Sequence, residues 1–205
     1  MGNPEIVNNT SPPLLQRLWR TARPWLATLG LVVLLRVTGL LAVISQISGS
    51  LLLKTGLLNA STESPAVIHP FPYDFALRDL HGRTVNVSQL RGKILFVNIW
   101  ATWCGPCRVE MPSINALYND IDSSRVAFLM ISVDKDGDFQ KVANFVSENG
   151  FLFPVYRSVN ALPDLLRVGS IPATFIVSRD GKVIVRESGL ANYNTQAVRK
   201  LLEAP

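Results

Sequence analysis

The sequence predicts one α/β domain, in which a central mixed sheet is flanked by helices. Two observations support this prediction: a strand, helix, strand order between residues 94 and 133, and an antiparallel hairpin followed by a helix near the end. A long apolar stretch precedes the domain. At 205 residues, the chain has room for one domain of about 130 residues and an appendage.

The N-terminal appendage is typical of a membrane anchor. Between residues 25 and 53 the only charged residue is Arg36, and a membrane helix needs about 20 apolar residues. Three arginines precede the stretch, which favours a cytoplasmic N-terminus: Arg17, Arg20 and Arg23. We therefore expect a cytoplasmic segment at 1–24, a transmembrane anchor at 25–53, and the rest of the chain on the outer side of the membrane.

Two other interpretations of this stretch stay open. It could be a cleaved signal peptide, with small residues at 48–50, although its apolar length exceeds that of a signal core. It could also be a hydrophobic helix of the domain itself. If it is an anchor, Arg36 either extends toward the cytoplasmic side or precedes a shorter span that begins at Val37.

Serines, threonines and prolines at 54–72 predict a linker, followed by the domain at 73–205. Alternating residues around the His81-Gly82 turn predict a first hairpin. The apolar runs at 94–100 and 126–133 predict two buried strands, the second of them parallel, on either side of a helix at 106–118.

The remaining elements follow the same reasoning. We expect a helix at 139–147, a strand at 153–156 and a short helix at 161–168. Asp180-Gly181 predicts a tight turn between strands at 174–177 and 182–186. A final helix, capped by Asn194 or Thr195, is expected to end near Leu202.

The only two cysteines, Cys104 and Cys107, lie two residues apart where the strand at 94–100 gives way to a helix. A helix N-terminus favours thiolate over thiol, because unpaired N–H groups and the positive end of the helix dipole lie there. We therefore expect Cys104 to be the nucleophile. Cys107 lies one turn further along the helix, close enough to resolve a mixed disulfide on Cys104.

A metal site is a poor alternative for this pair. Zinc needs about four ligands, and only His69 and His81 could join the cysteines. The positions of these histidines do not match the spacing of a zinc motif. A structural disulfide is equally poor, since the loop that it closes is very short. Asp134, Asp136 and Asp138 do not form a calcium loop either, because no glutamate follows at the required position; a polar turn fits better.

Charge does not favour a nucleic-acid partner. The net charge of +5 divides into +3 for residues 1–72, with five basic and two acidic residues, and +2 for residues 73–205, with fifteen and thirteen. Without a basic cluster in the larger part, this balance predicts no nucleic-acid binding.

The segment at 98–112, which reads NIWATWCGPCRVEMP, resembles the active site of the TlpA/ResA-like branch of thioredoxin-fold proteins. The resemblance extends from about Tyr73 to Leu202. It implies a thioredoxin-like fold with an N-terminal β-hairpin and an inserted helix and strand between Cys104 and Pro172. It also implies a thiol-disulfide oxidoreductase, tethered to or secreted across a bacterial cytoplasmic membrane.

The resemblance assigns roles to further residues. Pro172 is expected to be cis and beside the dithiol, and the backbone of Ile171 to pair with substrate. Glu110 is expected to tune thiol ionisation and relay protons, because the position of the buried aspartate of compact thioredoxins is Asn98 here. The alternative for Glu110 is a solvated glutamate near a helix start. We expect Trp103 to be partly exposed as a partner contact, and Trp100 to be buried.

The sequence thus predicts a single-pass, membrane-anchored protein-disulfide reductase whose redox centre is the Cys104–Cys107 pair, with no other cofactor and no metal. Its partners would be protein disulfides and a membrane thiol electron donor. The resemblance implies apocytochrome c as one substrate class, in cytochrome c maturation. A disulfide-donating oxidase and a tethered binding or assembly module remain alternatives. A thiol peroxidase fits less well, since Val97 and Ala101 replace the proline and threonine of the peroxidase motif.

Overall fold

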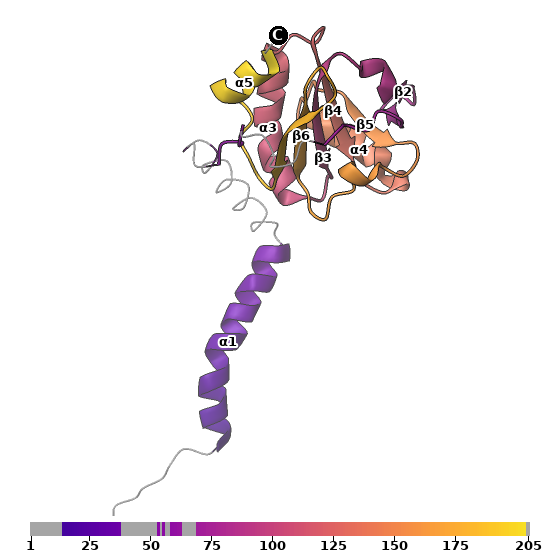
Figure 1. Cartoon of the computed structure of the whole chain (residues 1–205). Helices are drawn as coiled ribbons and strands as arrows, with labels where there is room; N and C mark the ends of the chain where they lie inside the picture. Colours follow the sequence, from indigo (N-terminus) through magenta and orange to yellow (C-terminus); the bar gives the residue numbers. More distant parts are fainter. Residues whose placement is uncertain (1–13, 38–52, 54, 56–57, 63–68, 204–205) are drawn as a thin grey trace, which may run out of the picture. The chain divides into compact units, whose positions relative to one another are not determined.

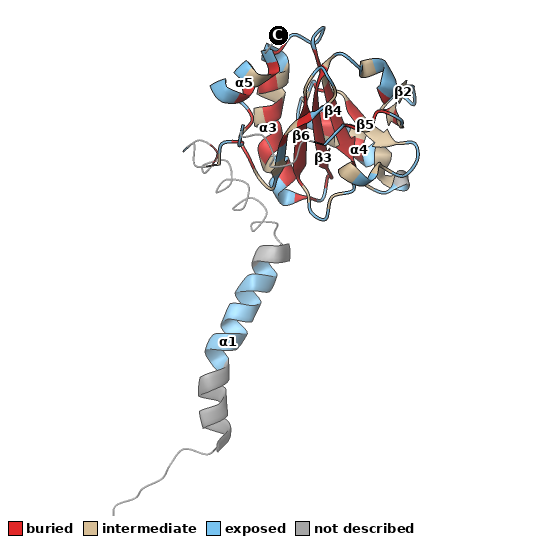
Figure 2. Ribbon diagram, in the orientation of Figure 1, coloured by how far each residue is buried: buried red, intermediate tan, exposed pale blue. Residues whose placement is uncertain are grey.

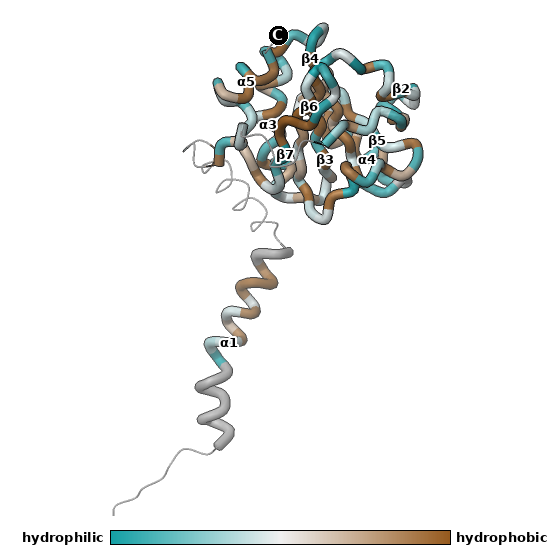
Figure 3. Tube along the Cα trace, viewed as in Figure 1, coloured by the Kyte–Doolittle hydropathy of each residue, from teal (hydrophilic) through white to brown (hydrophobic). Residues whose placement is uncertain are grey.

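The computed structural model describes residues 14–37, 53, 55, 58–62 and 69–203. The chain divides into two units, residues 1–44 and residues 45–205. The first unit contains helix α1 (Leu14–Val37), which includes Pro24 and exposes its side chains between residues 23 and 34. Its described second half is largely apolar (Figure 3).

The predicted anchor is only partly covered by the structure. The expected boundary between residues 24 and 25 falls inside α1, and residues 38–52 lie outside the described residues. None of the helices in the described part combines the length and the apolar character that a membrane span requires. The anchor at 25–53 therefore stays a prediction.

The second unit (Figure 1) contains a mixed sheet. This sheet has seven strands in the order β2-β1-β5-β4-β3-β6-β7. Strands β3, β4 and β5 run parallel to each other, and the other neighbours pair antiparallel. The strands are β1 (Ala76–Asp79), β2 (Thr84–Asn86), β3 (Ile94–Trp100), β4 (Val126–Ser132), β5 (Val155–Ser158), β6 (Ala173–Val177) and β7 (Val183–Ser188).

The central strand β3 has the predicted bounds, and all seven of its residues are buried (Figure 2). Its continuous apolar character follows from its position, since a parallel strand covered on both faces has no solvent side. Phe96 and Trp100 face one hydrophobic cluster, whereas Leu95 and Val97 face a second cluster on the opposite side of the sheet.

The three α-helices described between residues 69 and 203 pack on one face of the sheet, in one hydrophobic cluster. They are α3 (Gly105–Asp120), α4 (Phe139–Glu148) and α5 (Gln196–Glu203). The steps from β3 to β4 and from β4 to β5 move in the same direction, and right-handed crossovers therefore place α3 and α4 on the same side. Accordingly, the Arg108 guanidinium of α3 lies 5.5 Å from the ring centroid of Phe145 in α4. Arg199 of α5 binds Asp120 of α3 at 2.6 Å.

The opposite face carries 3-10 helices, which refines the prediction of flanking helices. Val87 of η1 (Val87–Leu90) and Leu166 of η3 (Asp164–Leu166) are buried in the second cluster, together with Phe71 and Tyr73. The helix expected at 161–168 is thus reduced to η3, because Pro163 disfavours helical backbone at the residue before it.

Strand β5 also differs from its predicted bounds. Strand β5 begins at Val155 and not at residue 153, since Pro154 has no N–H to contribute to a ladder. A third 3-10 helix, η2 (Asp136–Asp138), forms the polar turn before α4. The inserted α4 and β5 do lie between Cys104 and Pro172, as expected.

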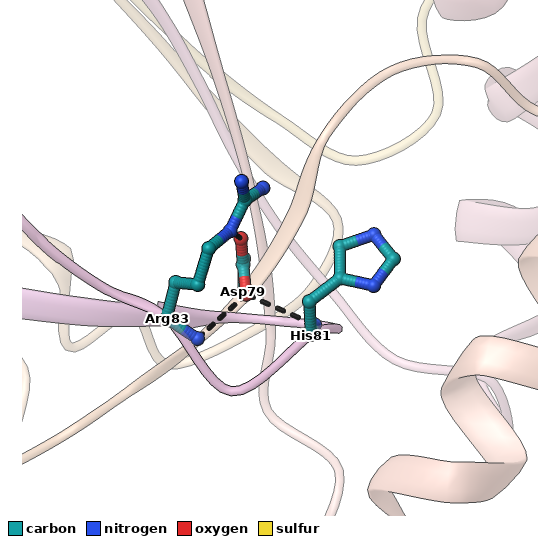
Figure 4. A network of polar contacts seen from close by, with 3 residues as sticks. All are labelled: Asp79, His81 and Arg83. Atoms are coloured by element: carbon teal, nitrogen blue, oxygen red, sulfur yellow. Dashed lines mark hydrogen bonds and ion pairs between the residues drawn. The ribbon is translucent and has the colours of Figure 1, made fainter.

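The turns of both predicted hairpins are confirmed. Gly181 adopts a φ of +81° between β6 and β7, a conformation that glycine tolerates. In the β1–β2 turn, Asp79 accepts hydrogen bonds from the backbone of His81 and Arg83, at 2.9 Å each (Figure 4). The imidazole ring of His81 takes no part in these bonds. At the last helix, the Thr195 hydroxyl caps the N–H of Val198 at 3.2 Å.

Parts of the predicted linker pair with the domain. We call residues 58–61 the strap: the N–H of Ala60 donates to the carbonyl of Asn192 at 3.0 Å, and the N–H of Asn192 donates to the carbonyl of Leu58 at 2.7 Å. Phe71 bonds the carbonyl of Gly181 at 2.8 Å. The packing of the domain therefore starts before residue 73, whereas the domain limits themselves stay a prediction.

Candidate active site

The cysteine pair lies where β3 passes into α3. Cys104 is the N-cap of α3, with an extended backbone, and Pro106 occupies its first turn. The Sγ of Cys104 accepts a hydrogen bond from the N–H of Cys107 at 3.2 Å. The two cysteines form a disulfide, with their Cα atoms 5.3 Å apart.

The two sulfurs differ in accessibility. Cys104 is 5% exposed, whereas Cys107 is 0% exposed and packs among the buried residues of α3. A reagent that approaches from solvent can therefore meet Cys104 first. This asymmetry matches the predicted order of events, in which Cys104 attacks and Cys107 resolves.

The segment before β6 lies against the disulfide. The peptide bond between Ile171 and Pro172 is cis, as expected, and the carbonyl oxygen of Ile171 lies 3.8 Å from the Sγ of Cys104. Strand β6 starts at the next residue, where Ala173 pairs with Ile99 of β3. The sheet thus brings together two segments that are 67 residues apart in the sequence.

Glu110 is fully buried on α3, three residues after Cys107 and therefore on a neighbouring turn of the same face. The alternative of a solvated glutamate near the helix start is therefore wrong. Its carboxylate oxygens accept hydrogen bonds from the side chain of Asn98 at 2.8 Å and from the N–H of Ala191 at 3.4 Å. Burial raises the pKa of Glu110 to about 8, although these two hydrogen bonds act in the opposite direction.

Two buried residues extend this polar cluster, and sequence analysis missed both. The second amide hydrogen of Asn98 goes to the hydroxyl of Thr174 at 2.9 Å, and these residues are register partners in β3 and β6. Tyr193 is also fully buried, and the pKa of its hydroxyl is raised by burial and by the Glu110 charge. No sequence motif marks either residue, because only the folded chain places Thr174 and Tyr193 near Asn98 and Glu110.

A groove borders the disulfide on its open side. Trp103 contributes a side chain that is 66% exposed, as expected for a partner contact, whereas Trp100 is buried. Most of the residues that line the groove are apolar or small. One of them is Ile171, whose carbonyl oxygen lies beside the Sγ of Cys104. The lining residues are Trp103, Val133, Val168, Gly169, Ser170 and Ile171.

Asp134 joins the two loops that carry Trp103 and Val133 of this groove, and sequence analysis assigned it only to a polar turn. One of its oxygens accepts hydrogen bonds from the N–H of Thr102 at 2.9 Å and from the hydroxyl of Ser132 at 2.8 Å. The other accepts from the hydroxyl of Thr102 at 2.6 Å. Within the described residues, no group of three metal-ligating side chains is arranged to hold a metal ion.

Comparisons with known proteins agree with this architecture. Residues 67–186 match the model of the AhpC/TSA family. The thiol-disulfide oxidoreductase ResA of Bacillus thuringiensis is 37% identical over 112 residues, which cover 54% of this chain and 64% of the relative. ResA of Geobacillus thermodenitrificans is 36% identical over 127 residues, which cover 61% and 72%. The chain thus spans less than two thirds of the length of the first of these relatives.

A solved structure shows the same fold. A thiol:disulfide interchange protein of the thioredoxin family from Chlorobium tepidum superposes with a TM-score of 0.55 at 26% identity. The match covers 68% of this chain and 99% of that protein. The fold is therefore thioredoxin-like, and the chain belongs to the AhpC/TSA family, as a ResA-like member of it.

Proposed function

We propose that this protein is a thiol-disulfide oxidoreductase that reduces disulfides of other proteins. The observation that carries the proposal is the pairing of an N-cap cysteine that is 5% exposed with a fully buried cysteine one helical turn away. The names of the ResA relatives and of the Chlorobium protein support the same activity.

The reaction transfers two electrons to the substrate. In the reduced protein, the Cys104 thiolate attacks one sulfur of a substrate disulfide and expels the other as a thiolate, which takes up a proton. The Cys107 thiolate then attacks the Cys104 sulfur and expels the second substrate thiolate, which is also protonated. The products are a substrate dithiol and the Cys104–Cys107 disulfide.

The local backbone favours the attacking form of Cys104. Its sulfur lies at the N-terminus of α3, where the helix dipole stabilises negative charge. The N–H of Cys107 already points at this sulfur at 3.2 Å in the disulfide form. The same donor can stabilise the Cys104 thiolate before it attacks.

Glu110 is suited to serve the buried cysteine. Cys107 must lose a proton before it can attack, and it has no solvent exposure. The carboxyl of Glu110 lies on the next turn of α3, and its burial raises its pKa to about 8. A group that titrates near neutral pH can both accept and return a proton during the reaction.

The groove beside Cys104 offers a place for the substrate chain. Trp103 provides an exposed aromatic surface, which is a common anchor in protein recognition. The backbone around Ile171 lies next to the sulfur just before β6 begins, where an extended substrate segment can pair with it. We therefore assign substrate contacts to Trp103, to the Ile171 backbone and to the neighbouring Pro172.

We further propose that the domain works outside a bacterial cytoplasmic membrane, anchored by residues 25–53. The support is the apolar stretch with Arg36 as its only charge and the arginines before it. On this model, a membrane thiol electron donor reduces the Cys104–Cys107 disulfide again, and apocytochrome c is one substrate. Membrane fractionation of the full chain checks the anchor: recovery in the soluble fraction, or cleavage before residue 53, would rule it out.

A trapping experiment tests the activity. The Cys107→Ser variant should accumulate mixed disulfides through Cys104, whereas the Cys104→Ser variant should not, because its remaining thiol is buried. Absence of trapped proteins under reducing conditions would remove the proposed mechanism. Equilibration with glutathione gives the direction of electron flow: a reductase should have a potential below about −200 mV, and a disulfide donor a higher one.

A further inference from the structure

We propose that Asp134 is a positioning residue that holds together the two loops that carry Trp103 and Val133 in the active-site groove. The proposal rests on the function proposed above, because it assumes that substrate lies in this groove. Asp134 itself would touch neither substrate nor sulfur. It would act through Trp103 and Val133, the groove residues adjacent in sequence to its partner Thr102 and to itself.

The contacts form a closed set around one carboxylate. Thr102 donates both its N–H and its hydroxyl to Asp134, at 2.9 and 2.6 Å. Ser132 donates its hydroxyl to the same carboxylate at 2.8 Å, and accepts the N–H of Asp134 at 3.1 Å. Thr102 and Ser132 are buried. Hydrogen bonds to a carboxylate in such surroundings are stronger than those between neutral groups.

The place of these contacts in the fold explains their importance. Trp100 ends β3 and Ser132 ends β4, and the two residues are register partners. One further backbone bond, from the N–H of Val133 to the carbonyl of Trp100 at 2.9 Å, extends the ladder. Beyond it the two chains continue as loops, and the Asp134 carboxylate provides the connection between them.

Cys104 also has backbone hydrogen bonds that do not involve Asp134. The N–H of Cys104 donates to the carbonyl of Ala101 at 3.1 Å, and the N–H of Arg108 donates to the carbonyl of Cys104 at 3.2 Å. Cys104 is thereby attached to the first turn of α3. Loss of the Asp134 carboxylate should displace Trp103 relative to Val133 while the two sulfurs keep their place on the helix.

Paired substrates test this separation in the full-length protein. For Asp134→Ala, we expect the rate of the reduced protein with insulin to fall about tenfold, since bonds to a charged group are lost. The rate with cystamine, a disulfide too small to need the groove, should stay within about twofold, as should the equilibrium with glutathione. An equal loss on both substrates would show that Asp134 holds the dithiol itself, which overturns the proposal.

The conservative variant distinguishes geometry from charge. In Asp134→Asn, the amide oxygen can accept from the Thr102 N–H and from Ser132, and the amide nitrogen can donate to the Thr102 hydroxyl. We expect this variant to recover the insulin rate to within about twofold of the unchanged protein. Failure of Asn to restore the rate would mean that the negative charge acts directly, and would also overturn the proposal.

Two further measurements keep the test independent of folding and of the proposed function. Thr102→Val removes only the 2.6 Å bond and should give an intermediate insulin rate even if Asp134→Ala does not fold. Hydrogen exchange at the Thr102 N–H should be slow in the unchanged protein and in Asp134→Asn, and fast in Asp134→Ala. If the unchanged protein fails to reduce insulin while this exchange pattern holds, the proposed function fails, but the Asp134 connection between the two loops stands. If the exchange rate at the Thr102 N–H does not change in Asp134→Ala, the Asp134 connection is refuted.

Discussion

Asn98 donates a hydrogen bond from its side-chain amide to the buried carboxylate of Glu110 at 2.8 Å. The pair joins the central strand to the helix that bears both cysteines, and a side-chain amide does not titrate near neutral pH. Proton uptake in this pair therefore belongs to Glu110. Because Asn98 also bonds Thr174 at 2.9 Å, the orientation of its amide is fixed by two acceptors.

The first prediction concerns stability and Glu110. Burial raises the pKa of Glu110 to about 8, so the folded protein holds this proton over a pH range in which the unfolded chain has lost it. The stabilisation is fully present below about pH 4.5 and is lost as the pH rises toward 8. Glu110→Gln removes this dependence. In urea unfolding of the oxidised protein, the free energy of unfolding of Glu110→Gln should exceed that of the unchanged protein by a difference that grows to a few kcal/mol by about pH 8.

A matched substitution provides the control for this experiment. Glu148 lies exposed at the end of α4, and Glu148→Gln should leave the pH dependence of unfolding unchanged. If Glu110→Gln and the unchanged protein lose stability in parallel between pH 5 and pH 8, Glu110 does not hold a proton in the folded state.

The second prediction separates the two hydrogen bonds of Asn98. Thr174→Val removes one acceptor and leaves a buried amide hydrogen without its partner, which should destabilise the protein by about 1–3 kcal/mol. The bond to Glu110 remains, so the pKa of Glu110 should change little. Asn98→Ala removes a bond that lowers this pKa, and should therefore raise it further.

The measurement for this pair is the titration of the Glu110 carboxyl, followed by carbon NMR in each variant. A rise in Asn98→Ala and little change in Thr174→Val are expected. Equal movement in both variants would indicate that general repacking, and not the individual bond, sets the ionisation of Glu110.

The third prediction concerns the exposed aromatic ring beside the disulfide. Trp103→Ala should reduce the rate with insulin about tenfold or more, because aromatic anchors dominate many recognition surfaces. Stability should change by less than about 0.5 kcal/mol, as at other exposed positions. Leu152→Ala is the matched control, since Leu152 is 67% exposed against 66% for Trp103. A similar loss in both variants would contradict a specific role for Trp103.

The parts of the fold that could be predicted from the sequence are those with local signals. The seven buried residues of β3, the Asp180-Gly181 turn and the cysteine spacing each act within a few residues, and the structure matches them. The cis bond at Pro172 was expected from resemblance, since an isolated proline carries no such signal.

The rest of the site depends on contacts between distant segments. Asn98 meets Thr174 only because β3 and β6 pair in one register, and a shift of one strand by one residue would place the two side chains on opposite faces of the sheet. Asp134 reaches Thr102 across 32 residues for a similar reason. The burial of Glu110 also arises from packing, since a glutamate near a helix start is ordinarily solvated. Such relationships require the folded coordinates.

The fourth prediction concerns the strap, which sequence composition assigned to a linker. The N–H of Ala60 donates to the carbonyl of Asn192, next to Ala191, whose own N–H bonds the Glu110 carboxylate at 3.4 Å. Ala60→Pro removes the strap donor and should cost about 1–2 kcal/mol of unfolding free energy. It should also raise the pKa of Glu110 if the Ala191 donor moves away. Thr62 is exposed just beyond the strap, so Thr62→Pro should change neither the free energy of unfolding nor the pKa of Glu110. Equal effects of the two proline substitutions on both quantities would exclude a link between the strap and Glu110.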